Sequence, residues 1–191
     1  MKNEIINFLL HRRSVSVKSM VDVNISDKDL DDILAAGIRV PDHGALSPWK
    51  IITFRDEARH KFGREVVVKS FLKNNPKAEE DLINIEKNRF SRAPIVICVL
   101  SSPVESKKIP EWEMHLSSSI VCYNILIAAQ SLGYAAQWLT GWCAYDDNIL
   151  KALGGNINKD KIAGFINIGG KEKEPLERIR PARDNVITEW K

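Results

Sequence analysis

Two arginines and a serine stand together where the first helical pattern of the chain ends. Arg12, Arg13 and Ser14 come at the end of an apolar-periodic stretch over residues 2–12. A guanidinium fork can donate two parallel hydrogen bonds to phosphate oxygens, and a serine hydroxyl adds a third donor. The three residues are therefore chemically suited to a terminal phosphate. A structural role is simpler, because arginine in the last turn of a helix complements the helix dipole.

Other residues that could bind a ligand are scattered along the chain. A loop over residues 41–48 is predicted by its two prolines and its glycine; Arg39 precedes it and His43 lies near its start. Gly141 follows the strand-like stretch 137–140, and two arginines lie near the C-terminus, Arg178 and Arg180. Plain alternatives exist here too, since a loop histidine can have a local partner and a tryptophan such as Trp138 can belong to the core.

Several familiar motifs are missing from the sequence. No G-x-G-x-x-G follows a strand, and no G-x-S-x-G is present. The four histidines are scattered, and the single helical pair Glu111 and His115 offers only two ligands, which do not make a zinc site. We therefore expect no metal ion, and we assign no residue to acid–base catalysis.

The elements that must position these residues alternate unevenly between helix and strand. Helices are predicted at 2–12, from Ser26 to before Pro41, and at 56–74, 77–90, 111–132 and 146–153. Strands are predicted at 49–54, 94–100, 134–139, 162–168 and, as a short last strand, 186–188. This order favours an α+β domain with a central sheet. No repeat or linker divides the chain, so one domain over residues 1–191 is expected.

The longest predicted helix, residues 111–132, is apolar on more than one side. A helix of this kind is buried, either in the core or against a partner. Ser117, Ser118, Ser119, Asn124 and Gln130 within it argue against a lipid environment.

Composition excludes several classes of protein. The 191 residues are 44% hydrophobic and 28% charged, as in ordinary globular proteins. The net charge of +3 is too small to indicate nucleic-acid binding. Three cysteines cannot pair completely, and no signal peptide or run of eighteen apolar residues is present. We expect a protein of the cytoplasm, with neither membrane nor nucleic acid as partner.

Four segments resemble the FMN-dependent nitroreductase family, in the order in which that family carries them. They are Arg12-Arg13-Ser14 after a short apolar helix, Ala36 to His43 with Pro48-Trp49, Lys108 to Glu113 before the long helix, and Trp138-Leu139-Thr140-Gly141. The second segment is similar to the A-G-x-R-A-P-D-H pattern of a compact bacterial branch. Each segment alone is weak, but together they span most of the chain.

The resemblance implies a three-layer α+β fold with a central mixed sheet flanked by helices. It also implies a homodimer in which the long helix over 111–132 lies at the interface. Two FMN molecules would sit at that interface, each contacted by both chains. Arg12, Arg13 and Ser14 would hold the FMN phosphate and ribityl chain, and Arg178 or Arg180 would assist at the phosphate.

Around the flavin ring, the resemblance implies contacts from Arg39 and His43, one of them from the partner subunit. Four consecutive residues would line one face of the ring: Trp138, Leu139, Thr140 and Gly141. The amide of Gly141 would donate to flavin N5 or O4.

Two positions depart from the family pattern. Leu139 stands where the compact branch often has arginine, and Ser16 stands where larger members have lysine. Arg39 is then the better candidate to face N1 and O2 of the flavin, with Ser16 left as a polar contact.

The implied activity is oxidation of NADH or NADPH by hydride transfer to flavin N5. The reduced cofactor would then reduce a small aromatic acceptor, nitro-aromatic or quinone-like, with ping-pong kinetics. The alternative is a non-enzymatic flavin-binding or ligand-sensing module on the same fold, which the loss of the basic residue at Leu139 favours.

Overall fold

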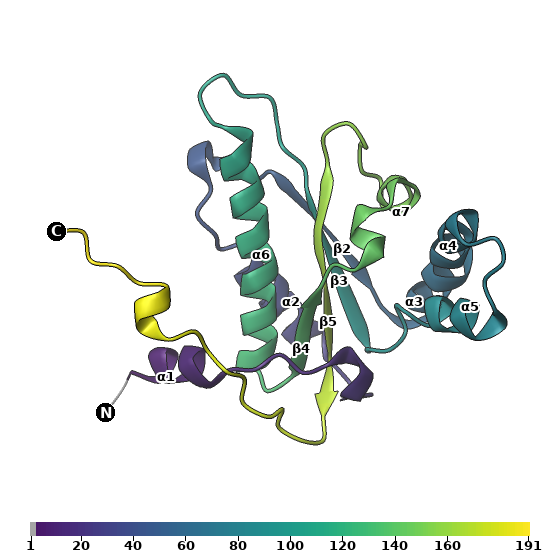
Figure 1. The fold of residues 1–191 in the computed structure, drawn as a ribbon, viewed down its shortest axis with the longest axis horizontal. Coiled ribbons are helices and arrows are strands. Elements are labelled where there is room, and N and C mark those ends of the chain that lie inside the picture. The colour runs from purple at the N-terminus through teal and green to yellow at the C-terminus, as the bar shows by residue number, and fades with distance from the viewer. Residues whose placement is uncertain (1–2) are drawn as a thin grey trace.

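A five-stranded sheet runs through the centre of the computed structural model, which describes residues 3–191 (Figure 1). Its strands are β1 (Met20–Val21), β2 (Trp49–Phe54), β3 (Ile95–Ser101), β4 (Ala135–Leu139) and β5 (Lys161–Lys171). The long strand β5 pairs with β1, β3 and β4, while β2 pairs with β3. The two-residue strand β1 was not predicted, because so short a segment carries no periodicity.

Every strand pair described in residues 3–191 is antiparallel, so the prediction of a mixed sheet is wrong for this chain. The strands that precede and follow the long helix in the sequence, β3 and β4, do run parallel to each other. They never pair, because β5 lies between them: Ile166 of β5 is opposite both Ile97 of β3 and Trp138 of β4. The α+β class is unaffected.

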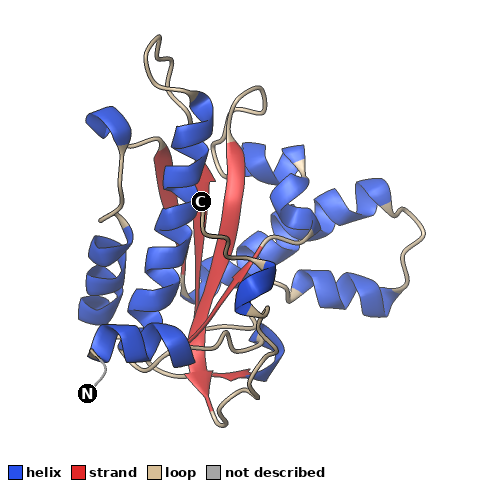
Figure 2. Cartoon of the chain, turned by 60° about the vertical axis from the view of Figure 1, so that its left-hand side comes forward, coloured by secondary structure: helices blue, strands red, loops and turns tan. Residues whose placement is uncertain are grey.

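The helices follow the predicted order. They are α1 (Glu4–His11), α2 (Asp27–Gly37), α3 (Asp56–Phe62), α4 (Val68–Asn74), α5 (Glu80–Lys87), α6 (Glu111–Ser131) and α7 (Asp147–Ala152). A π-helical turn, Gly63–Val67, joins α3 to α4 within the predicted helix 56–74. Ser26 begins α2 by accepting a hydrogen bond from the N–H of Asp29, as its capping sequence predicts. Together α4 and α5 project from the sheet, away from α1 (Figures 1 and 2).

Two apolar clusters cover the two faces of the sheet. On one face, α2 and α6 pack on the inward residues of β3 and β5 around Ile125. On the other face, phenylalanines from β2, α3 and β5 meet α7. Strand β3 is buried at every residue, which confirms that its unbroken apolar run lies between two layers. All three cysteines are free and buried: Cys98, Cys122 and Cys143.

The long helix α6 shows apolar residues on two sides, as predicted. Val121 and Ile125 are fully buried against the sheet. A second stripe at helical spacing faces outward, consisting of Trp112, Leu116, Ile120 and Tyr123, of which Trp112 is 67% exposed. Within the part of the chain that the structure describes, nothing covers this outer stripe.

The chain after β5 is extended and exposed, and it passes beside α1 (Figure 1). The predicted strand at 186–188 is wrong, because these residues follow a 3₁₀ turn at Arg183–Asn185 and pair with no strand. An apolar triplet forms a strand only where a sheet edge is within reach. None of the helices described between residues 3 and 191 has the length and apolar character needed to cross a membrane.

Candidate functional site

Arg12 and Ser14 are brought together at the end of α1. Arg12 Nε donates to Gln130 Oε1 at 2.8 Å, and its Nη2 donates to Ser14 Oγ at 3.3 Å. Gln130, in the last turn of α6, also donates from Nε2 to the carbonyl of Arg13 at 2.8 Å. A neutral amide therefore orients the Arg12 guanidinium without neutralising its charge.

The following residues run beside β4. The N–H of Val15 donates to the carbonyl of Ala136 at 3.3 Å, and the N–H of Val17 donates to Gln137 Oε1 at 2.7 Å. Ser16 lies between them, exposed, and its hydroxyl accepts from the N–H of Lys18 to begin a 3₁₀ turn. The serines of the N-terminal motif are thus fixed along one edge strand.

The C-terminal tail meets Arg13. Arg13 Nη1 donates to the carbonyl of Leu176 and lies 3.8 Å from Glu177 Oε1. Arg180 Nη2 donates to the same Glu177 oxygen at 3.2 Å, and so does the backbone N–H of Arg178 at 2.7 Å. The N–H of Arg178, with the Arg180 and Arg13 charges, lowers the pKa of Glu177. The side chains of Arg13 and Arg180 therefore meet at one carboxylate, which Arg178 contacts through its backbone N–H.

At the far end of β4 the backbone turns at Gly141, where φ is +59°. This left-handed conformation favours glycine. The Gly141 N–H has no protein acceptor anywhere in residues 3–191. Beside it, Leu139 and Thr140 line a cavity of about 40 Å³ together with Phe165 and Asn167.

Trp138 points to the opposite face of the sheet from Leu139. Its Nε1 donates to the carbonyl of Ala163 at 3.1 Å, and its ring lies so close to Gly164 that a Cβ there would be 1.9 Å from Nε1. Trp138 packs against the apolar cluster under α6. The pleat of β4 thus separates Trp138 from Leu139. Thr140 follows the end of the strand and lines the cavity with Leu139, so the three side chains do not line one surface as expected.

Arg39 and His43 lie along α6 at some distance from Arg12. Arg39 is exposed, and its carbonyl accepts from Asn124 Nδ2 at 3.0 Å. His43 Nδ1 is 2.7 Å from Oε2 of Glu113, in the first turn of α6. Glu113 and Gln130 are 17 residues apart on this helix, which corresponds to about 25 Å at 1.5 Å per residue. One chain therefore does not bring His43 to Arg12.

The two ends of β4 fit an elongated anionic ligand. The N-terminal motif lies beside Ala136, and Gly141 is five residues further on, about 16 Å along an extended strand. One end offers a guanidinium and a hydroxyl, and the other offers a free backbone N–H beside a cavity. This donor set suits a flavin mononucleotide, which has a phosphate at one end and a ring rich in acceptor atoms at the other.

Residues 9–170 match the model of the nitroreductase family. The chain belongs to the nitroreductase family. A relative in Haemophilus influenzae, named "Putative NAD(P)H nitroreductase", is 32% identical over 163 residues, covering 83% of this chain and 86% of its own. "Putative NAD(P)H nitroreductase YdjA" of Escherichia coli is 27% identical over 164 residues, covering 86% of each chain.

Solved structures of nitroreductases confirm the fold. A nitroreductase-like family protein of Bacillus cereus superposes with a TM-score of 0.80 at 22% identity, covering 100% of this chain and 97% of that one. A nitroreductase of Bacteroides fragilis with bound FMN superposes with a TM-score of 0.71, also at 22% identity, with both chains fully covered. The nitroreductase-like α+β fold expected from the sequence is therefore correct.

Two arginines of this nitroreductase that sequence reasoning missed line the cavity at Leu139 and Thr140. They are Arg89 and Arg92, which follow α5. The sequence gives no signal for them, because charged residues after a helix are typical of a solvated surface. Only the three-dimensional fold shows that the segment after α5 lies beside the end of β4.

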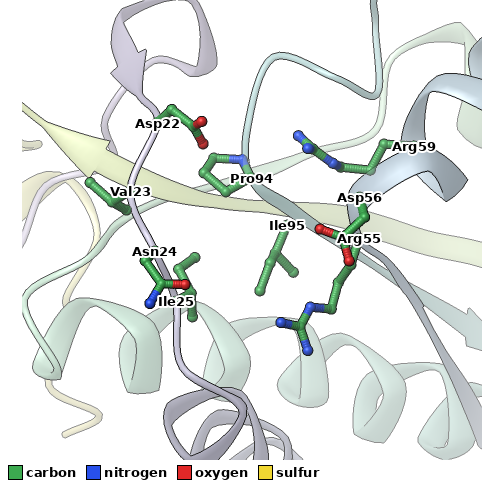
Figure 3. A pocket seen from close by; sticks show the side chains of 9 residues that line it. All are labelled: Asp22, Val23, Asn24, Ile25, Arg55, Asp56, Arg59, Pro94 and Ile95. Carbon is green, nitrogen blue, oxygen red and sulfur yellow. The ribbon is translucent and has the colours of Figure 1, made fainter.

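A larger hollow, of about 380 Å³, lies elsewhere, between the chain after β1 and the start of α3 (Figure 3). It is lined by both charge signs, with Asp22 and Asp56 opposing Arg55 and Arg59. Arg55 is already paired with Asp27 at 2.5 Å. None of the predicted site residues lines this hollow, and its balanced charges give it no preference for an anion.

Proposed function

We propose that residues 1–191 form one nitroreductase domain that binds FMN and oxidises NADH or NADPH. Nitroreductases are oxidoreductases, and this chain is a member of the family. The observation that carries the proposal is the pair of donor sets at the two ends of β4, Arg12 with Ser14 and the free N–H of Gly141. The names of the relatives and the FMN in the Bacteroides fragilis structure support it.

At the phosphate end, Arg12 and Ser14 would bind the FMN phosphate directly. Gln130 holds the Arg12 guanidinium in place, so little side-chain entropy would be lost on binding. Arg13 and Arg180 already bind one anionic group, the carboxylate of Glu177. They would supply the second basic contact at the phosphate or ribityl chain, with Arg178 next to them and Ser16 on the ribityl side.

At the ring end, FMN would supply the hydride chemistry between a nicotinamide and an acceptor when bound. The chain's part is to hold the Gly141 N–H in a fixed direction for an acceptor atom of the ring, while Leu139 and Thr140 limit access of water. Trp138 would support this end of β4 from the opposite face of the sheet, by packing against β5. The acceptors that we propose are small nitro-aromatic or quinone-like molecules, which can stack on a flat ring.

We propose that the active form is a homodimer. The outer stripe of α6 is apolar and uncovered in one chain, and a two-fold axis across it would bring the Glu113 end of one α6 to the Gln130 end of the other. Arg39 or His43 would then reach the site whose phosphate end belongs to the partner. For His43, this accounts for its distance from Arg12 within one chain.

Arg39 is our candidate to stabilise the negative charge on the N1 and O2 edge of reduced flavin. Arg39→Ala should lower the midpoint potential of the bound flavin, because a fixed cation beside the reduced ring is lost. A spectroelectrochemical titration measures this. An unchanged potential removes Arg39 from the role.

The activity is tested with the purified protein. We expect a yellow preparation, or one that becomes yellow on adding FMN, which NADH or NADPH bleaches under nitrogen and a nitro-aromatic or quinone acceptor restores. A colourless protein that takes up no FMN would overturn the proposal. Bleaching without recovery by any acceptor would instead favour the flavin-binding sensor. Leu139, which stands where the resemblance leads us to expect a basic residue, supports this alternative.

A further inference from the structure

Arg89 presents one unpaired amino group to the end of β4. Its Nη1 lies 3.8 Å from the position that a Cβ on Gly141 would occupy. No acceptor for Nη1 is present among residues 3–191. A positively charged donor and the free N–H of Gly141 are thus neighbours, beside the cavity that Arg89 lines with Leu139 and Thr140.

The other edge of the Arg89 guanidinium is held firmly. Nε and Nη2 donate to the two carboxylate oxygens of Glu86 at 2.6 and 2.5 Å. Trp142 Nε1 donates to the same carboxylate at 3.0 Å, and the Trp142 ring lies 5.9 Å from Arg89 Cζ. The Glu86 side chain is only 9% exposed, and that of Arg89 is 30% exposed. A bidentate pair fixes the plane of the guanidinium, and with it the direction of Nη1.

The guanidinium of Arg89 keeps its positive charge. The hydrogen bonds to Glu86 raise the pKa of Arg89 above its ordinary value, which burial by itself would lower. Leu139 and Thr140, which line the same cavity, carry no charge. The cations beside the cavity are Arg89 and Arg92, which follow α5.

We propose that Arg89 contacts the flavin of this nitroreductase and stabilises the negative charge that reduction places on it. Glu86 and Trp142 are positioning residues for Arg89. This inference rests on the proposed binding of FMN. Its physical basis is a donor fixed before the reaction in a partly buried place, which needs no reorganisation when charge develops.

The test uses Arg89→Met, which removes the charge and keeps the length of the side chain. We expect reduced FMN to lose at least about tenfold in affinity relative to oxidised FMN, equal to a fall of about 30 mV in the two-electron midpoint potential. Spectroelectrochemistry gives the potential, and titration of apoprotein with oxidised FMN gives the affinity. Arg64→Met is the matched control, because Arg64 also pairs with a glutamate, Glu57, and both of these side chains are exposed.

Arg89→Met alone leaves the carboxylate of Glu86 buried and unpaired, which can weaken the fold and also disfavour reduced flavin. The double variant Glu86→Gln with Arg89→Met removes both charges, so its net charge equals that of the parent. We expect its potential still to fall. A double variant that binds FMN at the parent's potential would overturn the role of Arg89 and leave the proposed function standing. A parent that binds no FMN would overturn both.

Discussion

At the residue scale, Arg12 and Arg13 are adjacent in sequence but differ in charge environment. Arg12 is bound by the neutral side chains of Gln130 and Ser14, so its full charge is available to a ligand. Arg13 faces the carboxylate of Glu177. Arg12 should therefore contribute more than Arg13 to the recognition of a phosphate.

This difference predicts the effect of Arg12→Ala. FMN affinity should fall by about ten- to a hundredfold, because hydrogen bonds to charged groups contribute roughly 1.5–3 kcal/mol and a tenfold change is 1.4 kcal/mol. The affinity for riboflavin, which has no phosphate, should change little. Quenching of flavin fluorescence measures both, and Arg183→Ala in the exposed tail is the control. Equal losses for the two ligands would contradict a phosphate contact.

The sequence predicted Arg12, Arg13 and Ser14 as a group, because they are consecutive and chemically alike. It could not predict Gln130, which is 118 residues away from Arg12 and is the residue that orients it. It missed Arg89 for the same reason. Contacts between distant segments leave no periodicity, and a polar residue on a helix is ordinary without knowledge of what it faces.

At the scale of elements, the turn after Gly141 is anchored by α7. Asp146 begins this helix by accepting from the N–H groups of Asn148 and Ile149, both at 2.9 Å, and Ser70 Oγ of α4 donates to it at 2.7 Å. Burial alone would raise the pKa of Asp146, but the hydrogen bonds from Ser70 and the two N–H groups outweigh it and lower the pKa.

We therefore expect Asp146→Ala to lower the free energy of unfolding by about 1 kcal/mol near pH 7, the usual cost of losing an N-cap. Because the folded pKa is lowered, the contribution of Asp146 is present above the unfolded pKa, about 3.9, and is lost as the pH falls through the folded value. Urea unfolding at pH 7 and pH 3 measures both. Asp147→Ala, at the exposed neighbour, should change little, and a difference that persists undiminished at pH 3 would contradict this account.

Elements with strong patterns were predicted well. Strand β2 has the predicted bounds, Trp49–Phe54, and α6 differs by one residue at its end. The predicted strand at 186–188 failed because β propensity needs a neighbouring edge, which the fold does not offer there. Residue pattern shows which face of an element is apolar, but not which other element covers it.

At the scale of the whole molecule, one surface remains apolar after folding. It includes the outer stripe of α6 and Ile5 of α1, which is 68% exposed and lines one hollow with Asn124 and Ile127 of α6. A soluble monomer rarely leaves so many large apolar residues together on its surface. This is the physical ground for a second copy, and it agrees with the separation of His43 from Arg12.

Leu116→Glu with Ile120→Glu should convert the proposed dimer to a monomer, because four buried charges at a two-fold interface would face one another. FMN affinity should fall with it, since the partner's Arg39 or His43 is lost from the site. Light scattering gives the mass, and Leu82→Glu on α5, where Leu82 is 49% exposed, is the control. A monomeric variant with full FMN affinity would show that each chain completes its own site.

The buried cysteines affect how a reductive titration of the FMN-bound protein is interpreted. Burial raises the pKa of Cys122 and Cys143 to about 12 and raises that of Cys98 as well, so all three thiols stay protonated. Thiolates are the form that reacts with oxidants or exchanges with disulfides. We therefore expect the three cysteines to add no reducing equivalents to a stoichiometric titration with dithionite, which should report on the bound flavin.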